Sequence, residues 1–198
     1  MARGGQFERD ICYMLSRWWT GNDEASVFWR ASQSGGRATV RHRKGRKTQG
    51  HYGDVVSTDP NSAPFTQLIT PELKRGYSKD SIHNLLDKPA HAKQQAVEKM
   101  IRQAKDASDK AGTPYWMLIM RRNMKVEFAF FPYKLYHALC VLNCFPKTPK
   151  PFLTLTAFVR GKSKKDQVKV QLVGMRLNHF LRSVDPGDIR ILVHKLGV

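Results

Sequence analysis

The sequence predicts an α/β fold, with a mixed central β-sheet of about five strands flanked by helices and a small basic C-terminal extension. Apolar residues at helical spacing alternate along the chain with short apolar runs of strand length. The chain has 198 residues, of which 41% are hydrophobic, enough for one full domain with an appendage. We therefore expect a main domain over residues 1–145 and an extension, made of a hairpin and a helix, over residues 146–198.

The first half of the chain divides into one helix and three strands. Phe7, Ile11 and Leu15 lie on one face of a helix, four residues apart. Pro71 lacks an N–H group, so it should place the third strand at an edge of the sheet or at a bulge. The expected elements are a helix over 5–19 and strands over 26–32, 52–58 and 65–74.

The second half continues with helices, two further strands and a hairpin. An apolar run at 115–120 has the length of a buried strand, and the prolines between 145 and 151 indicate a linker. The expected elements are helices over 78–86, 90–110 and 133–142, strands over 115–120 and 125–131, a hairpin formed by 152–159 and 167–173, a helix near 175–184, and a last segment that begins at Asp185.

The charge of the chain points to a polyanionic partner. Lys and Arg number 34 and Asp and Glu 16, so the formal net charge is +18. The 4 Trp, 6 Tyr and 10 Phe residues exclude a wholly disordered basic tail. No window is apolar enough to span a bilayer, so no membrane partner is expected, and the 3 Cys residues fit a reducing compartment. We expect a cytoplasmic protein that binds nucleic acid, located in the host cytoplasm if a virus encodes it.

Two basic runs carry much of this excess charge. The first is expected in a glycine-rich loop without apolar periodicity, where long cationic side chains can follow a charged strand. Its candidate DNA-binding residues are Arg37, Arg41, Arg43, Lys44, Arg46 and Lys47. The second run, over 160–169, is expected at the turn of the hairpin. For both runs, a solvated loop without a specific partner is the alternative.

Three residues on two predicted strands have the types that phosphodiester hydrolysis needs. Asp54 follows Gly53 at the start of one strand, and Glu72 and Lys74 point to the same face of the next. Two carboxylates can hold a hard divalent cation, and an adjacent ammonium can orient water or neutralise charge on phosphorus. Spacing alone leaves a second interpretation open, in which Glu72 and Lys74 form an exposed pair and Asp54 is a turn residue.

Gly53-Asp54 followed by Glu72-Leu73-Lys74 resembles the metal-binding motif of the PD-(D/E)XK nuclease superfamily, which places an Asp on one strand and Glu-x-Lys on the next. Two further segments, at residues 3–10 and 30–35, resemble the archaeal-type Holliday junction resolvases. The order of elements also matches. The resemblance covers roughly residues 3–132 and implies a restriction-endonuclease-like fold for the nuclease domain.

The resemblance also implies roles for individual residues. Asp54 and Glu72 would be direct metal ligands together with the main-chain carbonyl of Leu73, and Glu8 would approach the metal through water. Lys74 would be the catalytic lysine, which completes a catalytic set of Glu8, Asp54, Glu72 and Lys74. The implied metal is Mg²⁺, for which Mn²⁺ would substitute. Arg9, Arg30 and Ser34 match positions that the resolvases use around the scissile phosphate, and Arg3 and Ser32 are further candidate DNA-binding residues.

These features predict a metal-dependent endodeoxyribonuclease that cleaves branched DNA, with Holliday junction resolution as the implied reaction. Symmetric cutting of two strands calls for two active sites, so the resemblance implies a homodimer. The loop between Ser34 and Asp54 is longer and more basic than in the compact resolvases, and the segment after Phe145 matches no recognised pattern. Two alternatives therefore stay open: a related nuclease acting on linear duplex or DNA ends, and a non-catalytic basic nucleic-acid-binding protein. The source is left open among archaea, bacteria and viruses.

Other polar groups are given no active-site role. His137, Cys140 and Cys144 lack a fourth ligand at a suitable spacing, which favours packing in the core over metal binding. Gln94 and Gln95, at the start of the long helix, face either the cleft or the solvent.

Overall fold

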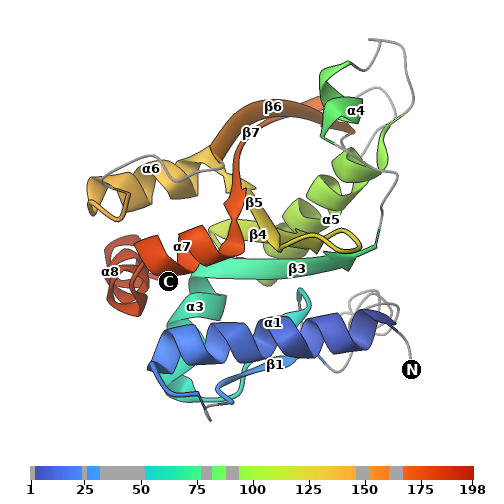
Figure 1. Cartoon of the computed structure of the whole chain (residues 1–198). Helices are drawn as coiled ribbons and strands as arrows, with labels where there is room; N and C mark the ends of the chain where they lie inside the picture. Colours follow the sequence, from blue (N-terminus) through green and yellow to red (C-terminus); the bar gives the residue numbers. More distant parts are fainter. Residues whose placement is uncertain are drawn as a thin grey trace, which may run out of the picture.

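The computed structural model of the chain describes residues 3–23, 26–31, 52–76, 82–87, 94–145, 152–160 and 167–198. The strands are β1 (Phe28–Arg30), β2 (Val55–Ser57), β3 (Ile69–Arg75), β4 (Tyr115–Arg121), β5 (Phe128–Pro132), β6 (Phe152–Arg160) and β7 (Gln167–Arg176). The helices are α1 (Arg3–Thr20), α3 (Ala63–Leu68), α4 (His83–Leu86), α5 (Ala96–Ala111), α6 (Tyr133–Val141), α7 (Leu177–Ser183) and α8 (Pro186–Leu196), with a 3₁₀ turn at Pro60–Ser62. Their arrangement is shown in Figure 1.

The central sheet has five strands in the order β3-β4-β5-β7-β6 and is mixed, as the sequence predicts. β3 runs parallel to β4, whereas the other neighbouring pairs are antiparallel. β3 forms one edge of this sheet, which confirms the edge position expected from Pro71. The predicted α/β class, with a five-stranded mixed sheet flanked by helices, is confirmed and is consistent with a restriction-endonuclease-like fold.

The strands predicted over 26–32 and 52–58 form an antiparallel ribbon of their own, β1–β2, outside the central sheet. The C-terminal hairpin supplies two strands of that sheet instead. β7 pairs with β5, and β6 pairs with β7 at the far edge. Residues 152–160 and 167–176 are therefore part of the central sheet, while the proposed division between residues 145 and 146 stays a prediction.

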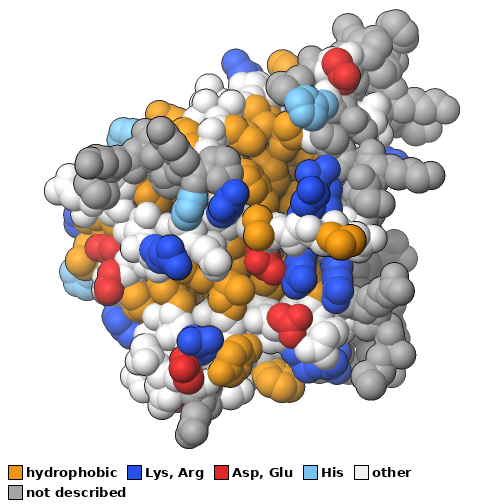
Figure 2. All heavy atoms as spheres, viewed as in Figure 1, with side chains coloured by type: hydrophobic (Ala, Val, Ile, Leu, Met, Phe, Trp, Pro, Cys, Tyr) orange, Lys and Arg blue, Asp and Glu red, His pale blue; other side chains and the backbone are white. Residues whose placement is uncertain are grey.

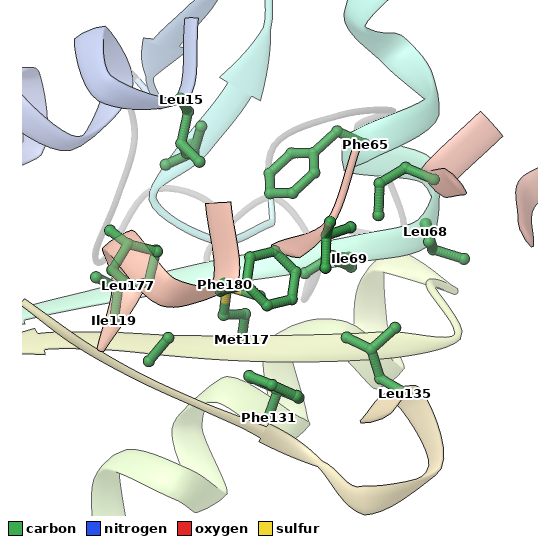
Figure 3. Packing of buried hydrophobic residues seen from close by; sticks show 14 of the residues in the cluster. Leu15, Phe65, Leu68, Ile69, Met117, Ile119, Phe131, Leu135, Leu177 and Phe180 are labelled. Carbon is green, nitrogen blue, oxygen red and sulfur yellow. The ribbon is translucent and has the colours of Figure 1, made fainter. Parts of the chain in front are cut away.

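Alternation along the strands separates two apolar cores. In β4, Met117 and Ile119 face the first core, and Trp116 and Leu118 face the second. The first core contains residues of α1, α3, α6, α7 and α8, whereas the second contains residues of α5. Figure 1 shows α1 and α5 on opposite sides of β3, and Figure 3 shows how closely side chains pack within the first core.

Both tryptophans at the end of α1 are packed into the first core. Trp18 donates its Nε1–H to the carbonyl of Val184 at 2.9 Å, and Trp19 donates its own to the carbonyl of Asn61 at 3.1 Å. The ring of Phe65 contacts both indoles edge to face. These hydrogen bonds satisfy the polar atoms of two large rings, and they join α1 to the end of α7 and to the 3₁₀ turn.

The strand predicted over 65–74 is wrong in its first half, where the chain forms α3. Asp59 accepts a hydrogen bond from a main-chain N–H at 2.7 Å and begins the 3₁₀ turn that leads into α3. Pro64 favours a helical φ in the first turn of α3. Phe65 and Leu68 are fully buried at a spacing of three residues, which fits a helix face and not the alternation of a strand.

Most other predicted elements are confirmed with shifts at their ends. The long helix begins at Ala96, and β5 begins at Phe128 after a turn in which Met124 has a φ of +56°. Residues 77–81, 88–93 and 146–151 lie outside the described ranges, so the expectations there are not compared. Within the described ranges, no helix combines the length and the apolar character needed to cross a membrane.

Gly174 lies in β7 directly against two phenyl rings. A Cβ atom at this position would lie 2.7 Å from Cε1 of Phe130 and 2.8 Å from Cε1 of Phe128. We predict that Gly174→Ala lowers the free energy of unfolding by about 1–3 kcal/mol, because a packed core does not accept an added methyl group without strain. Urea unfolding followed by circular dichroism measures the change. Thr156→Ala, at an exposed position of β6, is the control and should change the free energy by less than about 0.5 kcal/mol. An equally small change for Gly174→Ala would contradict the packing.

Candidate active site

Asp54 is held against the open edge of β3 by two hydrogen bonds. Its N–H donates to the carbonyl of Pro71 at 2.9 Å, and its Oδ2 accepts from the N–H of Leu73 at 2.7 Å. The residue lies immediately before β2, whereas the sequence placed it inside a strand. These bonds fix the carboxylate beside the strand that carries the other two candidate residues.

Gly53 makes this close approach possible. Its φ is +84°, a left-handed conformation that residues with a side chain rarely adopt. A Cβ atom there would lie 2.6 Å from the carbonyl oxygen of Pro71 and 2.7 Å from Cγ2 of Thr70. The Gly53-Asp54 pair is therefore required by the backbone geometry as well as by the chemistry of the carboxylate.

Glu72 is a buried carboxylate on the face of β3 that looks toward α5. It is 3% exposed, and its Oε1 accepts from Nζ of Lys74 and from Nε2 of Gln103, each at 2.5 Å. Lys74 lies two residues along the strand and reaches the same face, as the strand period predicts. A carboxylate removed from water needs such partners, because desolvation disfavours its charged form.

Gln103 is a site residue that the sequence analysis missed. The prediction for this helix considered Gln94 and Gln95 instead, and Gln95 is the N-cap of α5, in a capping box with Glu98. Gln103 lies one residue before the buried Ala104, on the side of α5 next to β3. In the sequence, the only indication was that Gln103 is a polar residue next to the apolar stripe of the helix. Its partner is identified only by the packing of α5 on β3.

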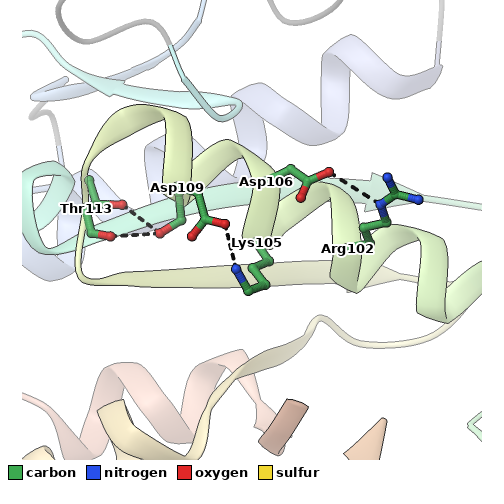
Figure 4. A network of polar contacts seen from close by, with 6 residues as sticks. Arg102, Lys105, Asp106, Asp109 and Thr113 are labelled. Atoms are coloured by element: carbon green, nitrogen blue, oxygen red, sulfur yellow. Dashed lines mark hydrogen bonds and ion pairs between the residues drawn. The ribbon is translucent and has the colours of Figure 1, made fainter. Parts of the chain in front are cut away.

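The Glu72–Lys74 pair differs from the ion pairs on the surface of α5. Figure 4 shows two of the latter, Arg102–Asp106 and Lys105–Asp109, each between residues four apart. Their side chains are 36–60% exposed, whereas those of Lys74 and Glu72 are 16% and 5% exposed. Exposed pairs typically add about 0–1 kcal/mol to stability, whereas removing one partner of a buried pair leaves an uncompensated charge. The interpretation of Glu72 and Lys74 as an exposed pair is therefore wrong.

The position of Asp54 raises the pKa of its carboxyl. Burial is the largest cause and the charge of Glu72 the second, and the pKa rises from 3.8 to about 7. The charge of Glu8 raises the pKa further, while the Leu73 N–H and the Lys74 ammonium lower it. Carboxylates therefore repel one another across this edge, and a divalent cation between them would relieve the repulsion.

α1 brings Glu8 to this region from the other side of β3. Cys12, one helical turn beyond Glu8, is buried, and its burial is the main reason that its pKa rises to about 12. The charges of Glu8 and Asp54 raise the same pKa, and the Arg30 guanidinium lowers it. Glu8 and Asp54 both act on this thiol, and Glu8 also acts on the Asp54 carboxyl, so the two carboxylates lie within range of each other's charge.

Two of the predicted phosphate-binding arginines lie together beside the first turns of α1. A Cβ atom at Gly5 would lie 3.1 Å from Nη1 of Arg30 and 3.9 Å from Nη1 of Arg9. Arg3 begins α1. The remaining predicted DNA-binding residues lie outside the described residues, namely Ser32, Ser34, Arg37, Arg41, Arg43, Lys44, Arg46 and Lys47.

The oxygen atoms at the edge of β3 are suitable ligands for a hard divalent cation. Oδ1 of Asp54 and Oε2 of Glu72 accept no hydrogen bond from the described residues. The N–H and C=O of one strand residue point to the same side, so the carbonyl of Leu73 faces the edge where Asp54 lies. The described ranges contain no group of three His, Cys, Asp or Glu side chains able to hold a metal. A bound ion would therefore use water and phosphate oxygens as well, which is usual for Mg²⁺.

The raised pKa of Asp54 predicts a pH-dependent stability of the metal-free protein. Between about pH 4 and 7 the folded protein binds more protons at this group than the unfolded chain, so the free energy of unfolding falls as pH rises. Asp54→Asn should remove this loss and be the more stable protein above pH 7, by at most roughly 4 kcal/mol. Urea unfolding at pH 5 and pH 8 with a chelator measures the difference, and Asp109→Asn controls for the loss of an exposed carboxylate. A difference between wild type and Asp54→Asn that is the same at both pH values would contradict the prediction.

Comparison with known protein families gives a match over nearly the whole chain. No curated protein and no solved structure matches it. The family model described as "Phage putative PDDEXK endonuclease" matches residues 1–190, a range that contains Glu8, Asp54, Glu72 and Lys74. Nucleases of this superfamily act on DNA and typically depend on a divalent metal, which agrees with the donor groups at the β3 edge. The chain therefore belongs to this phage family of PDDEXK endonucleases.

Proposed function

We propose that the protein is a Mg²⁺-dependent endonuclease that cleaves branched DNA, with the four-way junction as its preferred substrate. The observation that carries the proposal is the convergence of Asp54, Glu72 and Lys74 at the open edge of β3. The family supports the coarser part of it, a nuclease that acts on DNA.

In this proposal the metal is held by Asp54, Glu72 and the carbonyl of Leu73, while Glu8 contacts it through water. When bound, Mg²⁺ would polarise the phosphoryl group and lower the pKa of a water molecule. Mn²⁺ is also suited to carboxylate, carbonyl and water ligands and would substitute. The chain's own part is to supply oxygen donors at a rigid strand edge, because the hydrogen bond from Leu73 fixes the Asp54 carboxylate.

Lys74 would act on the attacking water or on the phosphate. Its Nζ lies 2.5 Å from Oε1 of Glu72, so the ammonium is held at the same edge as the carboxylates. A cation there would orient the water or stabilise the negative charge that develops on the phosphoryl oxygens. Gln103 donates to the same oxygen of Glu72 and would act as a positioning residue for that carboxylate.

Support for branched DNA comes from the charge and from the arginines beside α1. Contacts to phosphates fix the position of a protein on DNA without reading its base sequence, which suits recognition of a branch by its shape. Arg9 and Arg30 lie together near Gly5, and the net charge of +18 favours phosphate binding. A homodimer would present two active sites for symmetric cutting of the two strands. The proposed location is the cytoplasm of the phage's host.

Asp54→Asn and Lys74→Ala should each reduce the rate of cleavage at least about 100-fold, because each removes a group that stabilises the transition state. Binding to DNA should stay within a few-fold of wild type, since most of the proposed phosphate contacts are made by other residues. Single-turnover cleavage of a labelled four-way junction in Mg²⁺ measures the rate, and fluorescence anisotropy in chelator measures the binding.

Matched controls for these variants come from the exposed pair on α5. Asp109→Asn and Lys105→Ala make the same changes in an exposed ion pair, in which Nζ of Lys105 lies 2.6 Å from Oδ2 of Asp109. Both variants should cleave like wild type. Circular dichroism checks that each variant is folded. A folded Asp54→Asn or Lys74→Ala protein that cuts the junction at the wild-type rate would show that the site is assigned wrongly.

The substrate part of the proposal has its own test. Wild-type protein should cut a four-way junction faster than a flap, a nicked duplex or plain duplex of the same sequence, with Mg²⁺ and not with chelator. The reason is that a branch offers phosphates in directions that one straight duplex does not. Equal rates on plain duplex and junction would overturn junction selectivity while leaving the nuclease activity in place.

A further inference from the structure

A recess lies on the face of the sheet that carries Glu72 and Lys74. Its volume is about 510 Å³, within the range of pockets that hold small ligands. The floor is apolar and is built by Met120 of β4, Phe128 and Phe130 of β5 and Leu153 of β6. In Figure 2 this region is an apolar hollow in the upper part of the view, with Lys and Arg side chains at its border.

The strand register connects this recess to the candidate active site. Lys74 is paired with Met120, Met120 with Phe128, and Phe128 with Arg176. Paired residues on neighbouring strands point to the same face, so these four side chains form one row across the sheet. Neighbouring strands lie about 5 Å apart, so Phe128 is about 10 Å from Lys74 along this row. A DNA strand held at Lys74 would therefore reach the recess within a few nucleotides.

The aromatic floor depends on the absence of a side chain in β7. The rings of Phe128 and Phe130 lie with centroids 5.0 Å apart over Gly174, where a Cβ atom would come within 2.7 Å of one of them. Phe130 is buried, whereas Phe128 is half-buried and borders the recess. The face of a phenyl ring is a surface on which any nucleobase can stack.

The border of the recess is cationic. Arg122, Lys125 and Arg176 line it and are exposed, and none of the described lining residues is acidic. An apolar floor with a cationic border complements a nucleotide, whose flat base is apolar on its faces and whose phosphate is an anion. A base paired within a duplex cannot enter, so the complementary ligand is an unpaired nucleotide.

We propose that this recess binds an unpaired nucleobase of the DNA substrate, a few nucleotides from the phosphate that is cut. The base stacks on Phe128, and the neighbouring phosphates contact Arg122, Lys125 and Arg176. This assignment rests on the proposed nuclease function and adds a feature to it: one nucleotide beside the cleavage point of the junction is unpaired when the protein binds it.

The test measures DNA binding by the full chain in chelator, so that no cleavage occurs. A branched DNA with a short unpaired segment at the branch is compared with versions in which one nucleotide at a time is replaced by an abasic analogue. Wild type should bind about tenfold more weakly when the base at one particular position is missing. Phe128→Leu should bind the intact DNA about tenfold more weakly and should no longer distinguish the abasic version at that position.

Phe158→Leu is the matched control, because Phe158 is 50% exposed on β6 and does not line the recess. It should keep the wild-type affinity and the wild-type sensitivity to the missing base. A second pair avoids any loss of core packing: Val126→Glu places an anion at the border of the recess, and Val141→Glu makes the same change on α6. Only Val126→Glu should lower the affinity for the intact DNA more than for the abasic version.

Affinities that respond to no abasic position, or that change equally in Phe128→Leu and Phe158→Leu, would overturn the proposal. If Phe128→Leu fails to fold, the two glutamate variants decide in the same way. Cleavage of the same DNA in Mg²⁺ separates this result from the proposed function. If the protein cuts the DNA but its affinity does not respond to a missing base, the recess assignment alone is overturned. If its affinity responds to a missing base but it does not cut, the nuclease function alone is overturned.

Discussion

The open edge of β3 is the constraint on which the candidate site depends. An edge strand presents main-chain N–H and C=O groups without a strand partner, and this edge uses two of them to hold Asp54. The carbonyl of Pro71 accepts from the Asp54 N–H, and the Leu73 N–H donates to its carboxylate. Since Pro71 has no N–H to offer, a regular strand could not continue the ladder at this point. The chain beside it bends at Gly53, and the bend leaves a carboxylate where a further strand would otherwise lie.

The buried carboxylates of the site explain why basic side chains lie beside them. Burial makes the charge of Asp54 unfavourable and raises the pKa of its carboxyl. Lys74 and Arg30 supply nearby positive charge. Lys74 contacts Glu72 directly, and Arg30 acts on the Cys12 thiol, on which Glu8 and Asp54 also act. The excess of Lys and Arg over the whole chain serves a different purpose, because it attracts a phosphate backbone over long distances. The local cations stabilise the site, whereas the global charge brings the substrate.

The sequence was sufficient where a signal is local and insufficient where it depends on packing between elements. The stripe of Phe7, Ile11 and Leu15 predicted α1, and the period of two predicted that Glu72 and Lys74 share a face. It failed at Phe65, because a short apolar stretch before a strand has no periodicity of its own, and here it forms α3 directly after the 3₁₀ turn that Asp59 caps. It missed Gln103, whose partner lies 31 residues away and is reached only when α5 packs on β3. The pairing of the hairpin with β5 was missed for the same reason, because it depends on packing between distant elements and the register is not encoded in either strand alone.

Glu72 shows how the metal-free site can be stable and still be ready for a cation. Its Oε1 accepts two hydrogen bonds, one from an ammonium and one from an amide, so the buried charge is compensated without an ion. Its other oxygen accepts none from the described residues, so its lone pairs are not committed to them. A divalent cation at that oxygen would supply positive charge of its own and reduce the need for the contact with Lys74. The ammonium could then turn from Glu72 to the phosphate without leaving an unpaired carboxylate behind. In the proposed mechanism the same lysine would satisfy the carboxylate in the absence of substrate and would become available for chemistry when substrate and metal bind.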